Sequence, residues 1–367
     1  MISILLPHLR VGGAERVNLN LAYEFKRKGH QVEFVLMQAD GELLEEAESE
    51  FSVIDLNCPR VRSLPKNLLN YFRRNQPNIV IASIWPLTVI TSFAKLFSKH
   101  QFKLLICEHN NLSMQYKNKS WAHNLIMKIS MNLGYRLANA RVGVSNGVVN
   151  DIAKLSGLKQ KMFNVIYNPV QPCSKPSVDA LKYAEKLWSC PSGVRIVTVG
   201  NLTKQKNHDL LLRSFAKLDI SEARLMFVGD GEFRETIIQR AQELGISDQI
   251  IMAGFQSDPI PFYKTANLFV LSSDYEGLPL VIIEALACGT PVVSTDCHSG
   301  PAEILVNGRY GRLVPVGDVN ALSKAIKMEI QDQKYDISLI KRAEEFSPKK
   351  VASKYLNLLE EKILNYD

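Results

Sequence analysis

The sequence predicts an α/β protein with two doubly wound, parallel-sheet domains. Three observations lead to this fold class: a length of 367 residues, a composition with 46% hydrophobic and 22% charged residues, and two blocks in which short β-branched runs alternate with amphipathic segments. Such a length corresponds to about two domains. Alternating strands and helices are typical of parallel sheets covered on both faces by helices. The composition excludes a disordered chain, a collagen-like chain and a small disulfide-stapled domain.

The first block is predicted to form one domain over residues 1–170. Helices are expected between most of its strands, for example over Ala14–Lys28, where apolar residues fall on one face. The irregular stretch 171–192, which contains prolines and two cysteines, is predicted to be a linker. The predicted strands of this block are Ile2–Leu6, Gln31–Met37, Asn78–Ile84, Lys103–Glu108, Ala140–Ser145 and Phe163–Asn168.

The second block is predicted to form a domain over residues 171–347, which includes the linker. Its expected helices are His208–Leu218, Glu232–Leu244 and Leu278–Cys288. The expected strands are Arg195–Gly200, Arg224–Gly229, Gln249–Gly254, Leu268–Ser273, Pro291–Asp296 and Gly311–Val316. Doubly wound sheets bind ligands at the carboxyl ends of their strands, so functional side chains are expected in the loops that follow. The two domains are expected to face each other across a cleft.

Charge is distributed unevenly along the chain. Residues 1–170 contain 21 basic and 12 acidic residues, whereas the net charge of the whole chain is +7. Residues 56–150 contain 13 basic residues and a single carboxylate, Glu108, which is expected to pair with a nearby Lys or Arg. A basic field of this kind attracts anionic lipids, nucleic acids or phosphorylated ligands. A solvated basic face that binds nothing is an equally good interpretation.

Cysteine usage and hydropathy bound the location of the protein. The six cysteines have irregular spacing and form no C-x-x-C pair, which argues against a disulfide framework or zinc site and favours a reducing compartment. The start of the chain, Met1–Pro7, has no basic region and is not expected to be a signal peptide. The longest apolar stretch, Ile79–Ala94, is shorter than the ~20 residues that a membrane-spanning helix needs. We therefore expect a cytoplasmic protein that is at most peripheral to a membrane.

The strongest motif is a pair of glutamates, Glu276 and Glu284, that follows the strand Leu268–Ser273. Pro279 suits the first turn of a helix, and Gly277 lets the backbone approach a ligand closely. Free amides at that helix start, together with the helix dipole, favour an anion. Glu284 lies in an otherwise apolar helix, where a carboxylate needs a partner. The two carboxylates are therefore predicted to contact separate parts of one ligand.

Other candidates also follow predicted strands. Lys206 lies in the loop after Arg195–Gly200, and although it could be a solvated surface lysine, its position after a buried strand favours a ligand role. Gly12 and Gly13 open a helix, where backbone amides can cradle a phosphate. His109 ends another strand and is either a ligand contact or a polar residue of the loop. The chain has neither G-x-G-x-x-G nor a P-loop motif.

These motifs, taken in order, resemble those of the retaining glycosyltransferases of family 4 (group 1), which have the GT-B fold. Glu276–Pro291 resembles the E-x7-E region of that family, and Val199–Asn207 resembles its donor-phosphate loop. Val228–Glu232 resembles the turn after the next strand, and Gly12–Arg16 resembles the N-terminal Gly-Gly loop. Each motif alone is weak, but their shared order and spacing are highly specific.

The resemblance implies a role for each of these side chains. Glu276 would lie near the transferred sugar, Lys206 would stabilise the departing diphosphate, and His109 would face the donor sugar. Asn201 stands where the family commonly has arginine, and Arg16, Arg10 or a helix dipole could supply the missing positive charge. Glu284 would hold the ribose hydroxyls. The donor-binding residues implied in this way are Glu284, Gly277, Leu278, Leu280, Asn201, Gly12, Gly13 and Arg16.

The implied reaction is transfer of a hexose or N-acetylhexosamine from a nucleoside diphosphate sugar, expected to be UDP-linked, with retention at the anomeric carbon. The C-terminal domain would bind the donor and the N-terminal domain the acceptor. The C-terminal segment 348–367, which contains the final helix Pro348–Asn365, would pack back on the N-terminal domain. No metal or other cofactor is expected, because the chain has no D-x-D. The acceptor is expected to be a glycan attached to a lipid diphosphate, in surface polysaccharide or glycoconjugate assembly; no nucleic-acid partner is expected.

Binding to an anionic membrane is expected from the basic stretch and from two segments that mix apolar and basic residues, Leu68–Arg74 and Leu125–Leu137. A nucleotide-sugar epimerase or hydrolase on the same fold is the alternative function, because fold does not fix function. The basic acceptor-side surface argues against that alternative. A non-catalytic relative is a third reading, and the retained Glu276, Lys206, His109 and Glu284 argue against it.

Overall fold

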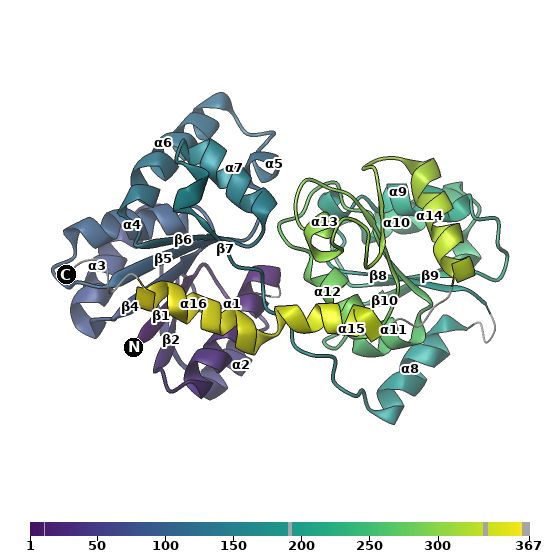
Figure 1. Cartoon of the computed structure of the whole chain (residues 1–367), viewed down its shortest axis with the longest axis horizontal. Coiled ribbons are helices and arrows are strands. Elements are labelled where there is room, and N and C mark those ends of the chain that lie inside the picture. Colours follow the sequence, from purple (N-terminus) through teal and green to yellow (C-terminus); the bar gives the residue numbers. More distant parts are fainter. Residues whose placement is uncertain (11, 190–192, 333–336, 362–367) are drawn as a thin grey trace. The chain divides into compact units, whose positions relative to one another are not determined.

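The computed structural model describes residues 1–10, 12–189, 193–332 and 337–361, which divide into two compact units (Figure 1). The first unit comprises residues 1–170 and 347–367, and the second comprises residues 171–346. Cys190 and the end of the predicted helix Pro348–Asn365 lie outside the described residues. Each unit is built on one parallel sheet, which confirms the predicted fold class.

The sheet of the first unit has the order β3-β2-β1-β4-β5-β6-β7, with every pair parallel. This is the strand order of dinucleotide-binding folds with one strand added. Strand β3 was not predicted from the sequence, because it is a short edge strand with no buried residue and so has no hydrophobic pattern. The strands are β1 (Ile2–Leu6), β2 (Val32–Leu36), β3 (Ser52–Asp55), β4 (Ile79–Ser83), β5 (Lys103–Glu108), β6 (Ala140–Gly143) and β7 (Asn164–Val165).

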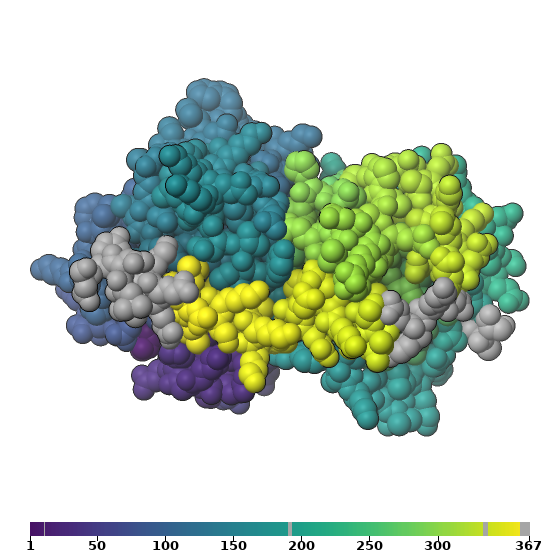
Figure 2. Space-filling view, in the orientation of Figure 1, coloured from purple at the N-terminus to yellow at the C-terminus, as the bar shows by residue number. Residues whose placement is uncertain are grey.

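Helices cover this sheet, and the last helix of the described chain returns to it. Helix α16 packs against α1, with the hydroxyl of Tyr355 3.2 Å from the Sγ of Cys107; it is part of the yellow segment in Figure 2. The α-helices of this unit are α1 (Gly13–Arg27), α2 (Leu44–Glu50), α3 (Leu64–Asn75), α4 (Leu87–Phe97), α5 (Leu112–Gln115), α6 (Trp121–Leu137), α7 (Asn146–Ser156) and α16 (Pro348–Glu361). Two 3-10 turns, η1 (Val61–Ser63) and η2 (Gln160–Met162), lie in connecting segments.

The second unit repeats the same plan, with the sheet order β10-β9-β8-β11-β12-β13. Its strands are β8 (Arg195–Val199), β9 (Arg224–Val228), β10 (Ile250–Gly254), β11 (Leu268–Leu271), β12 (Val292–Thr295) and β13 (Arg312–Val314). Its α-helices are α8 (Val178–Trp188), α9 (His208–Ala216), α10 (Arg234–Glu243), α11 (Ile260–Thr265), α12 (Leu280–Ala287), α13 (Pro301–Ile304), α14 (Val319–Asp332) and α15 (Ile337–Ala343). Short 3-10 turns are η3 (Lys204–Lys206), η4 (Ser247–Gln249) and η5 (Glu344–Phe346).

The prediction of a linker over residues 171–192 was wrong for half of its length, because α8 lies inside it. Ser177 caps this helix by accepting a hydrogen bond from the amide of Ala180. At its other end, Trp188 is fully buried and its Nε1 donates to the Oγ1 of Thr265, 2.9 Å away. Only two residues of the helix, Ala184 and Trp188, are buried, so its apolar periodicity in the sequence is weak.

Candidate active site

The best-supported site lies at the carboxyl edge of the sheet of the second unit. Strands β8, β9, β11 and β12 are parallel, so the loops that follow them meet at one edge. The first two loops are joined by a backbone hydrogen bond from the amide of Leu202 to the carbonyl of Asp230, 2.9 Å away. Another bond, from Asp274 to Gln205, joins the β8 loop to the β11 loop at 2.9 Å. The backbone alone therefore fixes how these loops lie against one another.

Glycines make this close approach of loops possible. Gly229 has a φ of +141°, and a Cβ there would lie 2.1 Å from the carbonyl oxygen of Gly200. Gly231 has a φ of +154°, and its Cβ would lie 2.6 Å from the carbonyl oxygen of Leu202. No larger residue fits either position. The segment Val228–Glu232 therefore places its backbone directly on the β8 loop that contains Lys206.

Two predicted catalytic residues, Lys206 and Glu276, form an ion pair in this site. The Nζ of Lys206 lies 2.7 Å from the Oε1 of Glu276, and the two side chains are 17% and 9% exposed. The Oγ of Ser273 also donates to Oε1 at 2.7 Å, and the Nε2 of Gln205 donates to Oε2 at 3.3 Å. Lys206 is therefore not a solvated surface lysine. An ammonium group that is largely shielded from water and held in a fixed position can stabilise negative charge that develops beside it.

Glu284 lies on α12 and has a partner within the protein. The hydroxyl of Tyr263, on α11, donates to its Oε2 at 3.0 Å. Burial, followed by the charge of Glu284, raises the pKa of Tyr263 well above its usual value, so the hydroxyl remains a donor. Glu284 itself is half-buried. Its carboxylate is thus oriented from one side while the residue keeps some exposure to solvent.

The segment before α12 differs in one detail from the expectation. Pro279 is the N-cap of α12 rather than a residue of its first turn, because its ψ of 101° is extended. Gly277 and Leu278 are buried, and Leu280 is half-buried. Gly300, with a φ of +95°, packs behind this segment: a Cβ there would lie 2.5 Å from the Cδ of Pro279. The loop is therefore supported from the β12 side.

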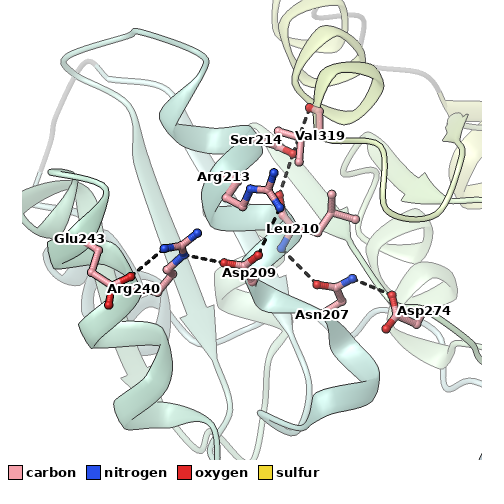
Figure 3. A network of polar contacts seen from close by, with 9 residues as sticks. All are labelled: Asn207, Asp209, Leu210, Arg213, Ser214, Arg240, Glu243, Asp274 and Val319. Carbon is pink, nitrogen blue, oxygen red and sulfur yellow. Dashed lines mark hydrogen bonds and ion pairs between the residues drawn. The ribbon is translucent and has the colours of Figure 1, made fainter.

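A polar network next to this loop orients α9 (Figure 3). Asn207, at a left-handed φ of 45°, caps the helix by accepting from the amide of Leu210, and its Nδ2 donates to Asp274 at 2.6 Å. Asp209 forms ion pairs with Arg213 and Arg240.

A pocket of about 460 Å³ opens beside the network, between α9 and α10, and Lys206, Glu276 and Glu284 do not line it. Asn201, the residue that departs from the family pattern, is exposed.

In the first unit, the Gly-Gly loop contains a carboxyl group of its own. Gly13 begins α1, and Gly12 is the N-cap with an extended φ of −163°. A Cβ at Gly12 would lie 2.4 Å from the Oε2 of Glu15, so a larger residue there would displace the Glu15 carboxyl group. Glu15 is buried, and burial raises its pKa. A phosphate bound at this helix start would therefore have Glu15 as a close neighbour.

The two arginines expected to replace the missing family arginine are paired with carboxylates. Arg16 contacts Glu46 at 2.8 Å, and Arg10 contacts Asp40 at 2.7 Å. Both pairs lie within the first unit and are largely exposed.

His109 follows β5 and is neutral over the usual pH range. Burial lowers its pKa to about 4, which a contact with the Asn168 side chain partly offsets, and neither ring nitrogen makes a hydrogen bond of good geometry within the described residues. Buried polar atoms without partners are uncommon and often mark a place where a ligand binds.

The expectation that Glu108 pairs with a Lys or Arg was wrong. Its carboxylate accepts from Tyr135 at 2.6 Å and Thr88 at 2.8 Å, and burial raises its pKa to about 7.

The residues that hold these side chains in place were not predicted from the sequence. Ser273 and Gln205 contact Glu276, and Tyr263 contacts Glu284. Ser273 is close to Glu276 in sequence, so its position at the end of β11 was an available signal. Tyr263 is 21 positions from Glu284, and no local pattern links the two.

Matches to protein-family models cover both units and agree with the family that the sequence motifs resemble. Residues 11–172 match the model described as Glycosyltransferase Family 4, and residues 191–346 match the model described as Glycosyl transferases group 1. The N-acetylgalactosamine-N,N'-diacetylbacillosaminyl-diphospho-undecaprenol 4-alpha-N-acetylgalactosaminyltransferase of Campylobacter jejuni is 25% identical, over 98% of this chain and 99% of its own. The lipopolysaccharide core biosynthesis glycosyltransferase LpsE of Rhizobium meliloti is 34% identical over 46% of this chain and 50% of its own.

Solved structures share the fold along the whole chain. HepE of Anabaena, solved in complex with UDP, has a TM-score of 0.84 at 19% identity and covers 98% of this chain and 99% of its own. The apo lipopolysaccharide outer core galactosyltransferase WaaB has a TM-score of 0.75 at 21% identity, with 99% and 100% covered. At these identities the likeness concerns the fold alone.

Proposed function

Because this chain belongs to the group 1 glycosyltransferases of family 4 and has their GT-B fold, we propose that it transfers a hexose or N-acetylhexosamine from a UDP-sugar to a lipid-linked glycan, with retention at the anomeric carbon. One observation carries this proposal: the contact between Lys206 and Glu276 at the carboxyl edge of the second sheet. An ammonium beside a carboxylate suits a departing diphosphate and a sugar that becomes positively charged. Lys206 would stabilise the first, and Glu276 would lie near the second.

The proposed donor site continues along α12. Glu284 is oriented by Tyr263, and its carboxylate would accept hydrogen bonds from the ribose hydroxyls. Gly277, Leu278 and Leu280 would form the wall of this site. By the same resemblance His109 is assigned to the sugar, and its buried ring nitrogens would hydrogen-bond to it. We assign UDP as the nucleotide because HepE was solved with UDP and with UDP-glucose.

The acceptor is proposed from relatives and from charge. The Campylobacter relative is named for an acceptor on diphospho-undecaprenol, and LpsE for lipopolysaccharide core synthesis. In the part of the chain that the structure describes, no helix is both long and apolar enough to cross a bilayer. We propose that the enzyme acts as a peripheral protein on the cytoplasmic face of an anionic membrane. The 13 basic residues of the stretch 56–150 support this location.

A donor panel tests the proposal. Thermal unfolding would be measured with UDP-, GDP- and ADP-sugars, and a donor at 100 times its Kd should stabilise the protein by about 2.7 kcal/mol. The stabilising donor would then be incubated with a polyprenyl-diphosphate-linked glycan and the product analysed by mass spectrometry and NMR. We expect UDP-sugars to stabilise the protein and an α-linked product to form from an α-linked donor. Donor consumption without an acceptor product would support the epimerase or hydrolase alternative instead.

A further inference from the structure

Helix α6 has an outward face made of large apolar side chains. Trp121, Leu125, Ile129 and Leu133 are spaced four residues apart, so they form a line along one side of the helix. Together with Ile126 they are 46–77% exposed, with Trp121 at 77%. The opposite side of α6, which includes Met127, Met131 and Tyr135, is buried against the unit. The helix is thus apolar on both sides, which is unusual for a helix at a protein surface.

Helix α4, which packs beside α6, also ends in exposed apolar residues. Helices α4 and α6 pack side by side, with Val89 of α4 against Gly134 of α6 (Figure 1). The last two apolar residues of α4, Leu96 and Phe97, are 60% and 74% exposed. We call these seven residues the α6 face; they are Leu96, Phe97, Trp121, Leu125, Ile126, Ile129 and Leu133. Scattered exposed apolar residues are ordinary, but a group on two adjacent helices marks a binding surface.

The charged residues of α6 and of the segments next to it in sequence are all basic. Residues 109–150 contain no Asp or Glu at all. The neighbouring cationic side chains are exposed and make no ion pair within the described chain; they are Lys99, Lys117, Lys119, Lys128 and Arg136. A surface with an apolar centre, a purely basic surround and a tryptophan at one end has the properties of an interfacial membrane helix.

We propose that the α6 face is the element that inserts into an anionic lipid surface. The inference rests on the proposed function, since it names the part of the enzyme that reaches the membrane where a lipid-linked acceptor would lie. The helix lies flat in the headgroup region, the line from Trp121 to Leu133 enters the acyl boundary, and the surrounding lysines contact lipid phosphates. Binding therefore has an apolar part, which salt does not screen, and an electrostatic part, which salt does.

The structure also decides between the two segments that the sequence suggested. Leu68–Arg74 belongs to α3, where Leu64, Leu68, Tyr71 and Phe72 are buried in the unit and Leu69 is half-buried. None of the large apolar residues of α3 is exposed, so that helix lacks the outward apolar face that the expectation requires. The segment Leu125–Leu137 belongs to α6 and does present apolar side chains to solvent. A second protein copy would also cover an apolar face, but the one-sided charge would then bring like charges together.

Vesicle flotation with a matched pair of variants tests the inference. The test variant is Ile126→Asp with Ile129→Asp, on the α6 face. The control is Val178→Asp with Ile337→Asp, at two positions of the second unit that are 66% and 61% exposed. Vesicles would contain phosphatidylcholine alone or with phosphatidylglycerol, and no acceptor. We expect the wild type and the control to float with anionic vesicles, and the test variant to bind at least tenfold less with an unchanged Tm.

Tryptophan fluorescence gives an independent measurement. Trp121 is 77% exposed, whereas Trp85 and Trp188 are 9% and 0% exposed, so a blue shift on adding vesicles reports Trp121. We expect this shift with the wild type and its loss in Trp121→Phe. The inference is overturned if the test variant binds vesicles as well as the control does. It is equally overturned if the wild type ignores vesicles while sedimentation shows a dimer that the two Asp substitutions dissociate.

These outcomes are separable from failure of the proposed function. Flotation uses vesicles without donor or acceptor, whereas the donor panel uses no lipid. A protein that floats but binds no nucleotide sugar would refute the glycosyltransferase proposal and leave the α6 face intact. A protein that binds UDP-sugars and fails to float would do the reverse.

Discussion

Replacing Lys206 by methionine should both destabilise the second unit and slow catalysis. The substitution removes the ammonium that lies 2.7 Å from the Oε1 of Glu276, whose side chain is 9% exposed. The remaining contacts of that carboxylate, with Ser273 and Gln205, come from neutral donors that do not balance its charge. Removing one partner of a buried ion pair costs about 3–5 kcal/mol, and the lower end applies here because Lys206 retains some exposure. For a domain of this size, such a loss lowers Tm by roughly 6–12 °C.

The effect on catalysis is separable from the effect on stability. Loss of one preorganised stabiliser of developing charge lowers kcat by about 10²–10³. In the double variant Lys206→Met with Glu276→Gln, no buried carboxylate is left without its cation, so most of the lost stability should return. Catalysis should not return, because neither charge is present. A double-mutant cycle over the four proteins gives the coupling between the two side chains.

The assay combines thermal unfolding with release of UDP from the stabilising donor. Lys26→Met is the control, because Lys26 pairs with Glu50 at 2.9 Å but the two side chains are 50% and 46% exposed. An exposed pair contributes less than about 1 kcal/mol, so Tm should hardly change. A Lys206→Met enzyme with wild-type kcat would refute the role of Lys206 at the diphosphate. A Tm equal to that of the Lys26→Met control would refute the argument from burial.

Three further predictions follow from other parts of the structure. Glu284→Gln should weaken UDP binding by about 1.5–3 kcal/mol, because a charge-assisted bond to ribose becomes neutral; calorimetry of a folded variant with unchanged affinity would disprove this. Transfer should persist in EDTA, because Lys206 supplies positive charge at the diphosphate, and a complete loss that Mg²⁺ restores would contradict it. The pKa of Glu108 is raised to about 7 by burial, so its protonated form stabilises the folded state. That stabilisation is full below pH ~4.5 and is lost as pH rises through 7. Glu108→Gln should therefore make Tm less dependent on pH between pH 5 and 8. A variant with the same pH profile of Tm as the wild type would count against the raised pKa of Glu108.

The sequence by itself determined the repeated βα order and the loops that carry the candidate residues. Buried parallel strands are continuous apolar runs, such as Leu268–Leu271, and they are visible without any knowledge of their neighbours. Because ligands collect after such strands, the positions of Lys206 and Glu276 followed from local pattern. Where an element is only partly buried, the hydrophobic pattern of the sequence did not predict it. Strand β3 has no buried residue and α8 has two, so neither produced a recognisable period.

Tertiary structure alone decided which side chains meet and which faces remain open. Lys206 and Glu276 are 70 positions apart, and Tyr263 and Glu284 belong to different helices, so their contacts depend on how loops and helices pack. Helix α6 shows the same limit for a surface. Its sequence is apolar on both sides, and periodicity cannot say which side the unit buries. Packing against α4 and α7 buries Met127 and Met131 and leaves Trp121 and Ile126 exposed, because a helix can place only one side against its neighbours.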